Sequence, residues 1–204
     1  LVTHGEYRQF VEAGGYQRPE LWLSDGWACL QENQWQAPLY WKAPLESNQH
    51  FTCHGVQELR ESAPVSHLSY YEADAYARWA GCRLPTEMEW EVGASRLSTN
   101  GAFLESQTFE PNAAERRTSA GGIRQLLGDV WEWTQSPYTP YPRYSPPPGA
   151  LGEYNGKFMC NQMVLRGGSC LTPQDHIRHT YRNFFPPHSR WMVSGLRLAR
   201  NVTP

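Results

Sequence analysis

One short segment of this sequence combines residue types that could hold a hard cation. Glu132 lies between Trp131 and Trp133 in the run 128–134. Two large aromatic side chains anchor such a segment in the interior, and the neighbouring backbone offers carbonyl oxygens beside the carboxylate. Oxygen ligands of this kind suit Ca²⁺. A fixed structural turn explains the pattern equally well, so the residues alone leave both interpretations open.

Two histidine pairs have spacings that also occur in metal sites. His50 and His54 are four residues apart, but the segment between them is typical of a strand, in which positions four apart lie roughly 13 Å from each other. His176 and His179 are three apart beside an aspartate, and we interpret that segment as a solvated loop. Neither pair predicts a metalloenzyme.

Five cysteines form no CxxC motif, and the odd count does not fit a complete disulfide framework: Cys29, Cys53, Cys82, Cys160 and Cys170. The printed sequence shows no signal-peptide pattern. We expect reduced thiols, several of them buried as small hydrophobic groups, and a cytoplasmic protein.

Length and charge narrow the classes of function. A chain of 204 residues fits one domain over 1–204, because a single core can grow to roughly 250 residues. The formal net charge of −2 gives no electrostatic signature of nucleic-acid binding. No run of about 18 apolar residues is present to span a membrane. We therefore expect a small-molecule or protein partner.

The composition predicts little regular secondary structure. Aromatic residues make up 13% of the chain, with 17 Gly and 16 Pro, which is typical of an interior built from large rings and irregular loops. Three helices are nevertheless indicated. Tyr7, Phe10 and Val11 have helical spacing before Gly14, and two capping boxes, Ser69 with Glu72 and Thr86 with Glu89, start helices that end near Gly81 and Ser95.

Short strands are predicted at 163–166 and 195–199, where β-branched or leucine residues gather. Between Thr134 and Gly152 the sequence is rich in proline. Proline lacks an N–H and disfavours helices and strand ladders alike, so we expect a long surface loop.

Several motifs together resemble the formylglycine-generating-enzyme-like (sulfatase-modifying factor) superfamily. They cover nearly the whole chain: 2–7, 83–90, 128–134, 164–169 and 194–199. The resemblance implies an α+β fold, an elaborated C-type lectin domain with a small twisted antiparallel sheet and a few short helices. Four further segments, 22–27, 69–75, 152–158 and 181–187, are most similar to the carboxy-terminal domain of the EgtB family, the sulfoxide synthases of ergothioneine biosynthesis.

The resemblance also implies which chemistry to expect. Formylglycine-generating enzymes use two cysteines in the segment that corresponds to 176–185, and this segment contains none, so copper-dependent oxidation of a sulfatase cysteine is disfavoured. EgtB enzymes hold Fe(II) by three histidines of an upstream DinB-type domain, with a His-x3-His-x-Glu signature. His50 and His54 lack the glutamate, so no iron ligand is predicted in this chain, which alone should be inactive.

Substrate contacts are assigned by the same resemblance to Arg182, Asn183, Phe184 and Phe185. In the EgtB family this segment lines the trimethylhistidine site. The chemistry fits, because an amide can bind a carboxylate or imidazole and each phenyl face attracts a quaternary ammonium by about 0.5–2 kcal/mol. Read without the family, the two phenylalanines are more simply a core pair before two prolines.

The sulfur donor follows from the next positions. EgtB proteins that bind γ-glutamylcysteine carry an Asp after the aromatic and an Arg a few residues on. This chain has Phe185 and, slightly beyond the second position, Arg190. We therefore expect free cysteine rather than γ-glutamylcysteine as the donor, with Arg190 as a candidate contact.

Two tyrosines and one cation site complete the implied set. Tyr138 and Tyr141 follow the Trp-Glu-Trp-Thr motif, where some members of the family place a catalytic tyrosine, although a tyrosine in a proline-rich loop is equally a packing residue. The Ca²⁺ site of formylglycine-generating enzymes would correspond to Gln125, Gly128, Val130 and Glu132. A buried Glu132 satisfied by backbone N–H groups is the alternative.

We interpret the sequence as the substrate-pocket domain of an iron(II)- and O₂-dependent sulfoxide synthase that joins trimethylhistidine to a cysteine thiol. An upstream DinB-type domain or partner chain would supply the iron. The rival class is a non-catalytic lectin-like ligand-binding module, and the upstream three-histidine bundle is the feature that separates the two. A weaker alternative is an ovothiol-type synthase, whose related domain carries a methyltransferase after the last strand.

Overall fold

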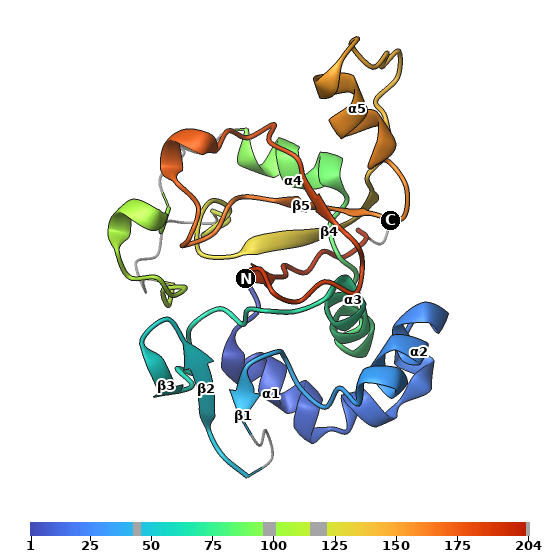
Figure 1. Cartoon of the computed structure of the whole chain (residues 1–204). Helices are drawn as coiled ribbons and strands as arrows, with labels where there is room; N and C mark the ends of the chain where they lie inside the picture. Colours follow the sequence, from blue (N-terminus) through green and yellow to red (C-terminus); the bar gives the residue numbers. More distant parts are fainter. Residues whose placement is uncertain (43–45, 96–100, 115–121, 203–204) are drawn as a thin grey trace.

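A computed structural model describes residues 1–42, 46–95, 101–114 and 122–202 (Figure 1). Its α-helices are α1 (His4–Glu12), α2 (Ser24–Asn33), α3 (Tyr70–Trp79), α4 (Glu87–Ala94) and α5 (Ala150–Lys157), with 3-10 turns at Gly15–Gln17, Pro19–Leu21, Leu104–Ser106 and Gln174–His176. Its strands are β1 (Trp41–Lys42), β2 (Gln49–Thr52), β3 (Gly55–Glu58), β4 (Trp131–Pro137), β5 (Met163–Arg166), β6 (Asn183–Phe185) and β7 (Ser194–Gly195). The predicted α+β class is confirmed.

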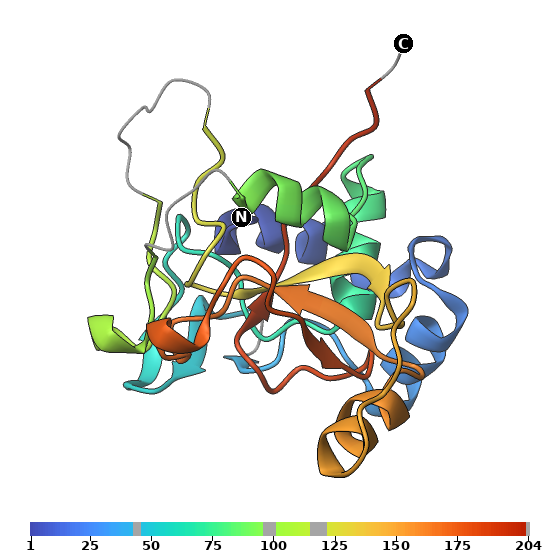
Figure 2. The same cartoon turned by 90° about the horizontal axis from the view of Figure 1, so that it is seen from above.

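Two small sheets organise the chain. The larger has the order β6-β5-β4-β7, in which β4 pairs antiparallel with β5 and parallel with β7. Helix α4 packs against β4 and β5, while α3 contacts β4 and α1 packs against α3 (Figures 1 and 2). The smaller antiparallel sheet, β1-β2-β3, lies to one side. Helix α5 belongs to the connection between β4 and β5 and projects from the body of the molecule.

Local sequence signals explain three of the helices. Both predicted capping boxes form, at Ser69 with Glu72 and at Thr86 with Glu89, and a third forms at Thr3 with Glu6. Each box satisfies backbone N–H groups that a helix leaves without partners at its first turn. The helices predicted near the start of the chain, after Ser69 and after Thr86 are therefore confirmed.

Three other predictions need correction. Residues 134–137 belong to β4 rather than to a loop, because Thr134 is buried and pairs through its hydroxyl with the Val164 carbonyl. The proline-rich stretch is a loop only up to Gly149, after which α5 begins. Of the strand predicted at 195–199, only Gly195 lies in β7, and Ala199 forms an isolated bridge with Arg83.

The core is dominated by aromatic rings packed between the helices and the larger sheet. Tyr7 and Phe10 of α1 meet Tyr76 of α3 at ring-centroid distances of 5.1 and 5.7 Å. Trp133 of β4 is fully buried, and its indole N–H donates to the Leu68 carbonyl at 2.8 Å. The neighbouring Glu132 is also fully buried and pairs with Arg197. Among the described helices, none is long and apolar enough to cross a membrane.

Candidate functional site

A hollow of about 560 Å³ opens between β6, the segment after β4 and helix α5. We call it the β6 hollow and define it by six of its lining residues: Tyr138, Tyr154, Phe158, Arg178, Asn183 and Phe184. A volume of this size is within the usual range of small-molecule pockets, about 300–1,000 Å³. Arg182 and Phe185, two further residues predicted to bind substrate, also line it.

The larger sheet brings the predicted residues together. Asn183 and Phe184 of β6 pair with Leu165 and Val164 of β5, which fixes the register of β6 at the edge of the sheet. Tyr138 follows the end of β4, and its ring stacks on Phe184 with centroids 3.9 Å apart and planes tilted by 7°. One face of Phe184 is thus covered by Tyr138.

Polar groups without protein partners are present at the hollow. The Asn183 side-chain oxygen accepts from the Phe184 backbone N–H at 3.0 Å, while the amide NH₂ makes no hydrogen bond among the described residues and stays available as a donor. The Gln162 side-chain oxygen is buried and has no partner within the described ranges. A water molecule or a ligand in the hollow could satisfy such an atom.

A buried ion cluster supports the hollow from behind. Glu87 accepts hydrogen bonds from the Arg166 guanidinium at 2.7 Å, from Arg182 at 2.6 and 3.0 Å, and from the Tyr141 hydroxyl at 3.1 Å. Arg166 is fully buried and also pairs with Glu91 at 2.7 Å. Arg182 is thereby held directly before Asn183, so the cluster sets the position of the predicted substrate contacts.

The two candidate catalytic tyrosines lie in different surroundings. Burial raises the pKa of Tyr138, and its hydroxyl donates to Asn155 of α5 at 3.4 Å. Burial also raises the pKa of Tyr141, with the Glu87 carboxylate as the next largest cause. The Arg182 guanidinium lies over both rings, at 4.7 Å from the Tyr138 centroid and 4.3 Å from that of Tyr141. Both phenols are held protonated, and only Tyr138 lines the hollow.

Arg190 lies apart from the β6 hollow. Its guanidinium donates to the buried carboxylate of Glu72 at 2.9 Å and to the Ala37 carbonyl, and it stacks over Trp35 at 4.3 Å. These contacts connect the chain after β6 to helix α3. The predicted role of Arg190 in substrate binding has no support in this geometry.

The residues predicted to hold calcium surround a guanidinium. Arg197 donates to both oxygens of the buried Glu132, at 3.0 and 3.2 Å, and to the backbone carbonyls of Arg124 and Gln125 at 2.7 and 2.8 Å. The Gln125 side chain instead donates to Asp129 and to the Asn112 carbonyl. Gly128 and Val130 precede Glu132 on the turn into β4. A positive charge already faces this carboxylate, so the donor set does not fit Ca²⁺ in this arrangement.

The histidine pairs do not assemble a metal site in the part of the chain that the structure describes. His50 lies on β2 and packs against His4, while His54 contacts the Thr108 carbonyl. His176 pairs with the Tyr181 hydroxyl at 2.8 Å. Within the described residues, no group of three His, Cys, Asp or Glu side chains could hold a metal ion.

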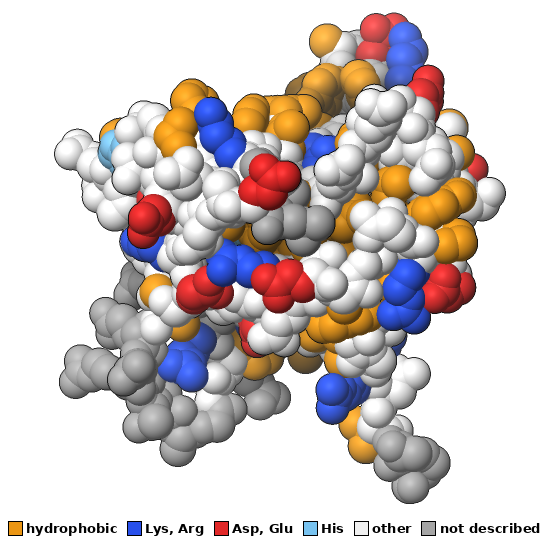
Figure 3. Space-filling view, turned by 90° about the horizontal axis from the view of Figure 1, so that it is seen from below, with side chains coloured by type: hydrophobic (Ala, Val, Ile, Leu, Met, Phe, Trp, Pro, Cys, Tyr) orange, Lys and Arg blue, Asp and Glu red, His pale blue; other side chains and the backbone are white. Residues whose placement is uncertain are grey.

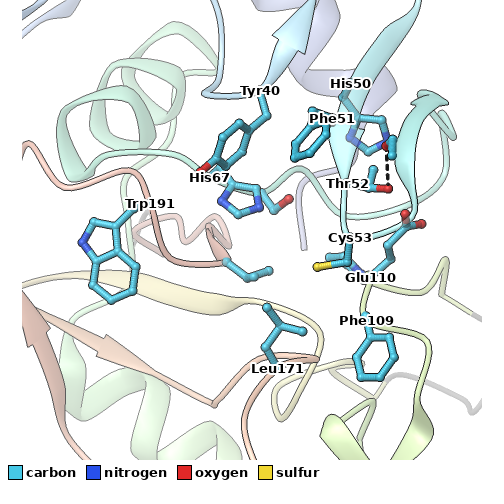
Figure 4. A pocket seen from close by; sticks show the side chains of 14 residues that line it. Tyr40, His50, Phe51, Thr52, Cys53, His67, Phe109, Glu110, Leu171 and Trp191 are labelled. Atoms are coloured by element: carbon cyan, nitrogen blue, oxygen red, sulfur yellow. Dashed lines mark hydrogen bonds between the residues drawn. The ribbon is translucent and has the colours of Figure 1, made fainter.

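A second hollow, of about 370 Å³, lies between the small sheet and the segment after β6 (Figure 4). Tyr40, Phe51, His67, Leu171 and Trp191 line it, and we call it the Trp191 hollow. Burial lowers the pKa of His67 to about 4, so this imidazole is neutral. Trp191 also contacts Phe185 edge to face at 5.1 Å. The sequence patterns did not predict this hollow.

Several residues of the β6 hollow and of the ion cluster behind it were not identified from the sequence. Glu87 lies in the motif 83–90, but its partners Arg166 and Arg182 are 79 and 95 residues away in sequence. Tyr154 and Phe158 belong to the segment 152–158 that resembles the EgtB family, and that resemblance was the one signal pointing to them. Nothing local indicated Arg178.

The fold and the arrangement of the hollow define a class of protein, and comparison with known proteins gives the same class. The model of the family described as "Sulfatase-modifying factor enzyme 1-like domain" matches residues 1–121 and 105–202. The chain belongs to this family, and the resemblance in the motifs is confirmed. Among solved structures, PvdO from Pseudomonas aeruginosa is similar, with a TM-score of 0.52 and 19% identity over 72% of this chain and 65% of that one. That likeness shows the shared fold alone.

Curated relatives are more informative. The hercynine oxygenase of Mycobacterium tuberculosis is 36% identical over 221 residues, covering 98% of this chain and 51% of the relative. The hercynine oxygenase of Mycolicibacterium smegmatis is 37% identical over 227 residues, covering 98% and 51%. The chain therefore spans about half the length of these relatives.

Proposed function

We propose that this chain is the substrate-pocket half of an EgtB-type sulfoxide synthase, an oxidoreductase that joins trimethylhistidine (hercynine) to a cysteine thiol. The supporting observation is the conjunction of two facts. The chain is 36–37% identical over 98% of its length to proteins named hercynine oxygenase, and its β6 hollow brings Tyr138, which follows β4, together with Asn183 and Phe184 of β6.

The atoms and electrons of the proposed reaction balance with O₂ as the oxidant. A C–H bond of the imidazole and the S–H bond of the thiol break, a C–S bond forms, one oxygen atom of O₂ ends on sulfur, and the other leaves as water with both hydrogens. Fe(II) would activate O₂ for this oxidation. No group of three suitable side chains meets in the described part of this chain. In the proposal, the iron ligands therefore come from a region that corresponds to the half of the relatives not matched by this chain.

The chain's own residues would bind and orient the substrate. The free Asn183 amide donates a hydrogen bond to the imidazole or carboxylate of trimethylhistidine, and the half-buried Phe184 ring packs against the ligand. The Tyr138 hydroxyl, whose pKa is raised by burial, keeps a proton that it can donate at the edge of the hollow. The Glu87 cluster fixes Arg182 and thereby the strand that carries Asn183.

Free cysteine is the donor that the residues favour. Phe185 stands where γ-glutamylcysteine-binding relatives place an acidic residue, and its ring packs against Trp191. Arg190 is committed to Glu72. Neither side chain is arranged to bind the extra charges of a γ-glutamyl group.

The test uses the complete polypeptide loaded with Fe(II), supplied with trimethylhistidine, cysteine and ¹⁸O₂. The expected product contains both substrates joined and one ¹⁸O atom. The variant Asn183→Ala should raise KM for trimethylhistidine about two- to tenfold, since a hydrogen bond is worth roughly 0.5–1.5 kcal/mol. Gln57→Ala, which removes an exposed amide from β3, is the matched control. Absence of a joined product with iron present would refute the synthase and leave a binding module.

A further inference from the structure

One of the two arginines that line the β6 hollow is free to bind a ligand. Arg182 uses its guanidinium on both oxygens of Glu87 and on the Thr139 carbonyl. Arg178 is exposed and lies 5.5 Å from the Tyr181 ring centroid. It pairs with no carboxylate among the described residues. A guanidinium in this setting is available for the carboxylate of a ligand.

An aromatic wall faces the same hollow from helix α5. Tyr154 and Phe158 are 61% and 43% exposed, and their ring centroids are 5.2 Å apart. Both rings also approach Phe184, at 6.4 and 6.1 Å. The charged residues of α5, Glu153 and Lys157, pair with each other at 3.3 Å and do not line the hollow. In Figure 3, charged side chains mark the outer end of this projection and hydrophobic ones gather near its base.

The arginine and the aromatic wall lie near one another. Tyr181 lines the hollow beside Arg178. Burial raises the pKa of Tyr181, Tyr154 raises it further, and Arg178 lowers it. Arg178, Tyr154 and Phe158 also line the same hollow, so a group that can bind a carboxylate and rings that can bind a quaternary ammonium face one pocket.

The residues that line the hollow favour a quaternary ammonium group of a ligand over a primary one. Neither Asp nor Glu is among the described residues that line it, so a primary ammonium would lose its water without gaining an anionic partner. A quaternary ammonium cannot donate hydrogen bonds and is attracted to aromatic faces instead.

We propose that the β6 hollow is a betaine site, in which Arg178 binds the carboxylate and Tyr154 with Phe158 bind the adjacent quaternary ammonium. Asn183 is then left for the imidazole. This inference rests on the proposed function and assigns specificity to three residues that the reaction itself does not require.

The affinities of three ligands for the complete polypeptide, measured by calorimetry, test the carboxylate contact and the ammonium contact separately. Trimethylhistidine carries both charges, its decarboxylated analogue carries only the quaternary ammonium, and histidine carries the carboxylate with a primary ammonium. Arg178→Gln should weaken trimethylhistidine about tenfold and leave the decarboxylated analogue unchanged. Arg178→Lys should restore part of the loss. Tyr154→Leu should weaken both methylated ligands about fivefold and leave histidine unchanged.

Matched controls are Arg18→Gln and Tyr144→Leu, which change a half-buried arginine that pairs with Glu20 and an exposed tyrosine, both outside the hollow. Equal losses for trimethylhistidine and its decarboxylated analogue in Arg178→Gln would overturn the assignment, as would unchanged binding in both variants. If the wild-type protein binds trimethylhistidine tightly in those cases, the proposed function survives and only this inference fails. If the wild-type protein binds none of the three ligands, both fail.

Discussion

Replacing Glu87 by glutamine tests whether the ion cluster behind the β6 hollow holds it together. Glu87 is buried and accepts from Arg166, Arg182 and Tyr141. Glutamine keeps the shape but removes the negative charge. Arg166, fully buried, would then have only the half-exposed Glu91 as an anionic partner, and Arg182 would have none among its present contacts.

Removing one partner of a buried ion pair costs about 3–5 kcal/mol, and the remaining Glu91 contact places Glu87→Gln near the lower end. For a domain of this length, about 3 kcal/mol corresponds to a fall in Tm of roughly 6–12 °C. Because Arg182 directly precedes Asn183, the affinity for trimethylhistidine should fall as well.

The assay is urea unfolding of the wild type, of Glu87→Gln and of the control Glu153→Gln. Glu153 pairs with Lys157 on α5 with both side chains 70% exposed, and such pairs contribute only about 0.3–0.5 kcal/mol. The reasoning is refuted if the two variants lose the same free energy of unfolding, or if Glu87→Gln unfolds like the wild type.

Three further predictions concern titration, thiol reactivity and the Glu132 cluster. Burial lowers the pKa of His67 to about 4 and that of His4 to about 3. Below pH 6.5 the unfolded chain therefore binds more protons than the folded one. The free energy of unfolding should fall as pH falls from 6.5 toward 4, by up to about 1.4 kcal/mol per pH unit for each histidine. His67→Asn, which tolerates the positive φ of this position, should show a shallower slope in urea unfolding across that window, and an unchanged slope would contradict this. Burial raises the pKa of Cys170 to about 12, so iodoacetamide should label the exposed Cys53 and Cys160 in the native protein and Cys170 only after unfolding; labelling of native Cys170 at a comparable rate would be inconsistent with its burial. Arg197→Gln should lower the free energy of unfolding by about 3 kcal/mol, because Glu132 is then buried without its cation. A calcium chelator should leave the Tm of the wild type unchanged. A fall in Tm on chelation would instead support the predicted calcium site.

Local signals predicted three of the five α-helices among the described residues. The Ser69 and Thr86 capping boxes are complete within four residues of sequence, so they can be identified without knowing the fold. Helix α2 lacks such a signal, since its N-cap Leu23 has no capping side chain. Helix α5 follows directly on a proline-rich loop and starts at a glycine in a left-handed backbone region, which hides it from composition-based reasoning.

The candidate site was predictable where a motif of the family could be identified in the sequence, as for Tyr138 after the Trp-Glu-Trp-Thr motif. Arg182, Asn183, Phe184 and Phe185 lie in one segment, and the structure places all four at one hollow. The prediction for Arg190 depended on a spacing after Phe185, but the chain turns there and directs the guanidinium to Glu72 on α3. The calcium prediction carried over ligands by position and had no means of seeing Arg197, which comes from 65 residues further along. Such long-range pairs are decided by the fold rather than by local sequence.

The most direct test of the central claim is a crystal structure of the complete polypeptide with trimethylhistidine bound. The account predicts the ligand in the β6 hollow, with the Asn183 amide within hydrogen-bond distance and its trimethylammonium group against the rings of Tyr154 and Phe158. A ligand bound instead in the Trp191 hollow, or at a site that does not include Asn183 and Phe184, would contradict it.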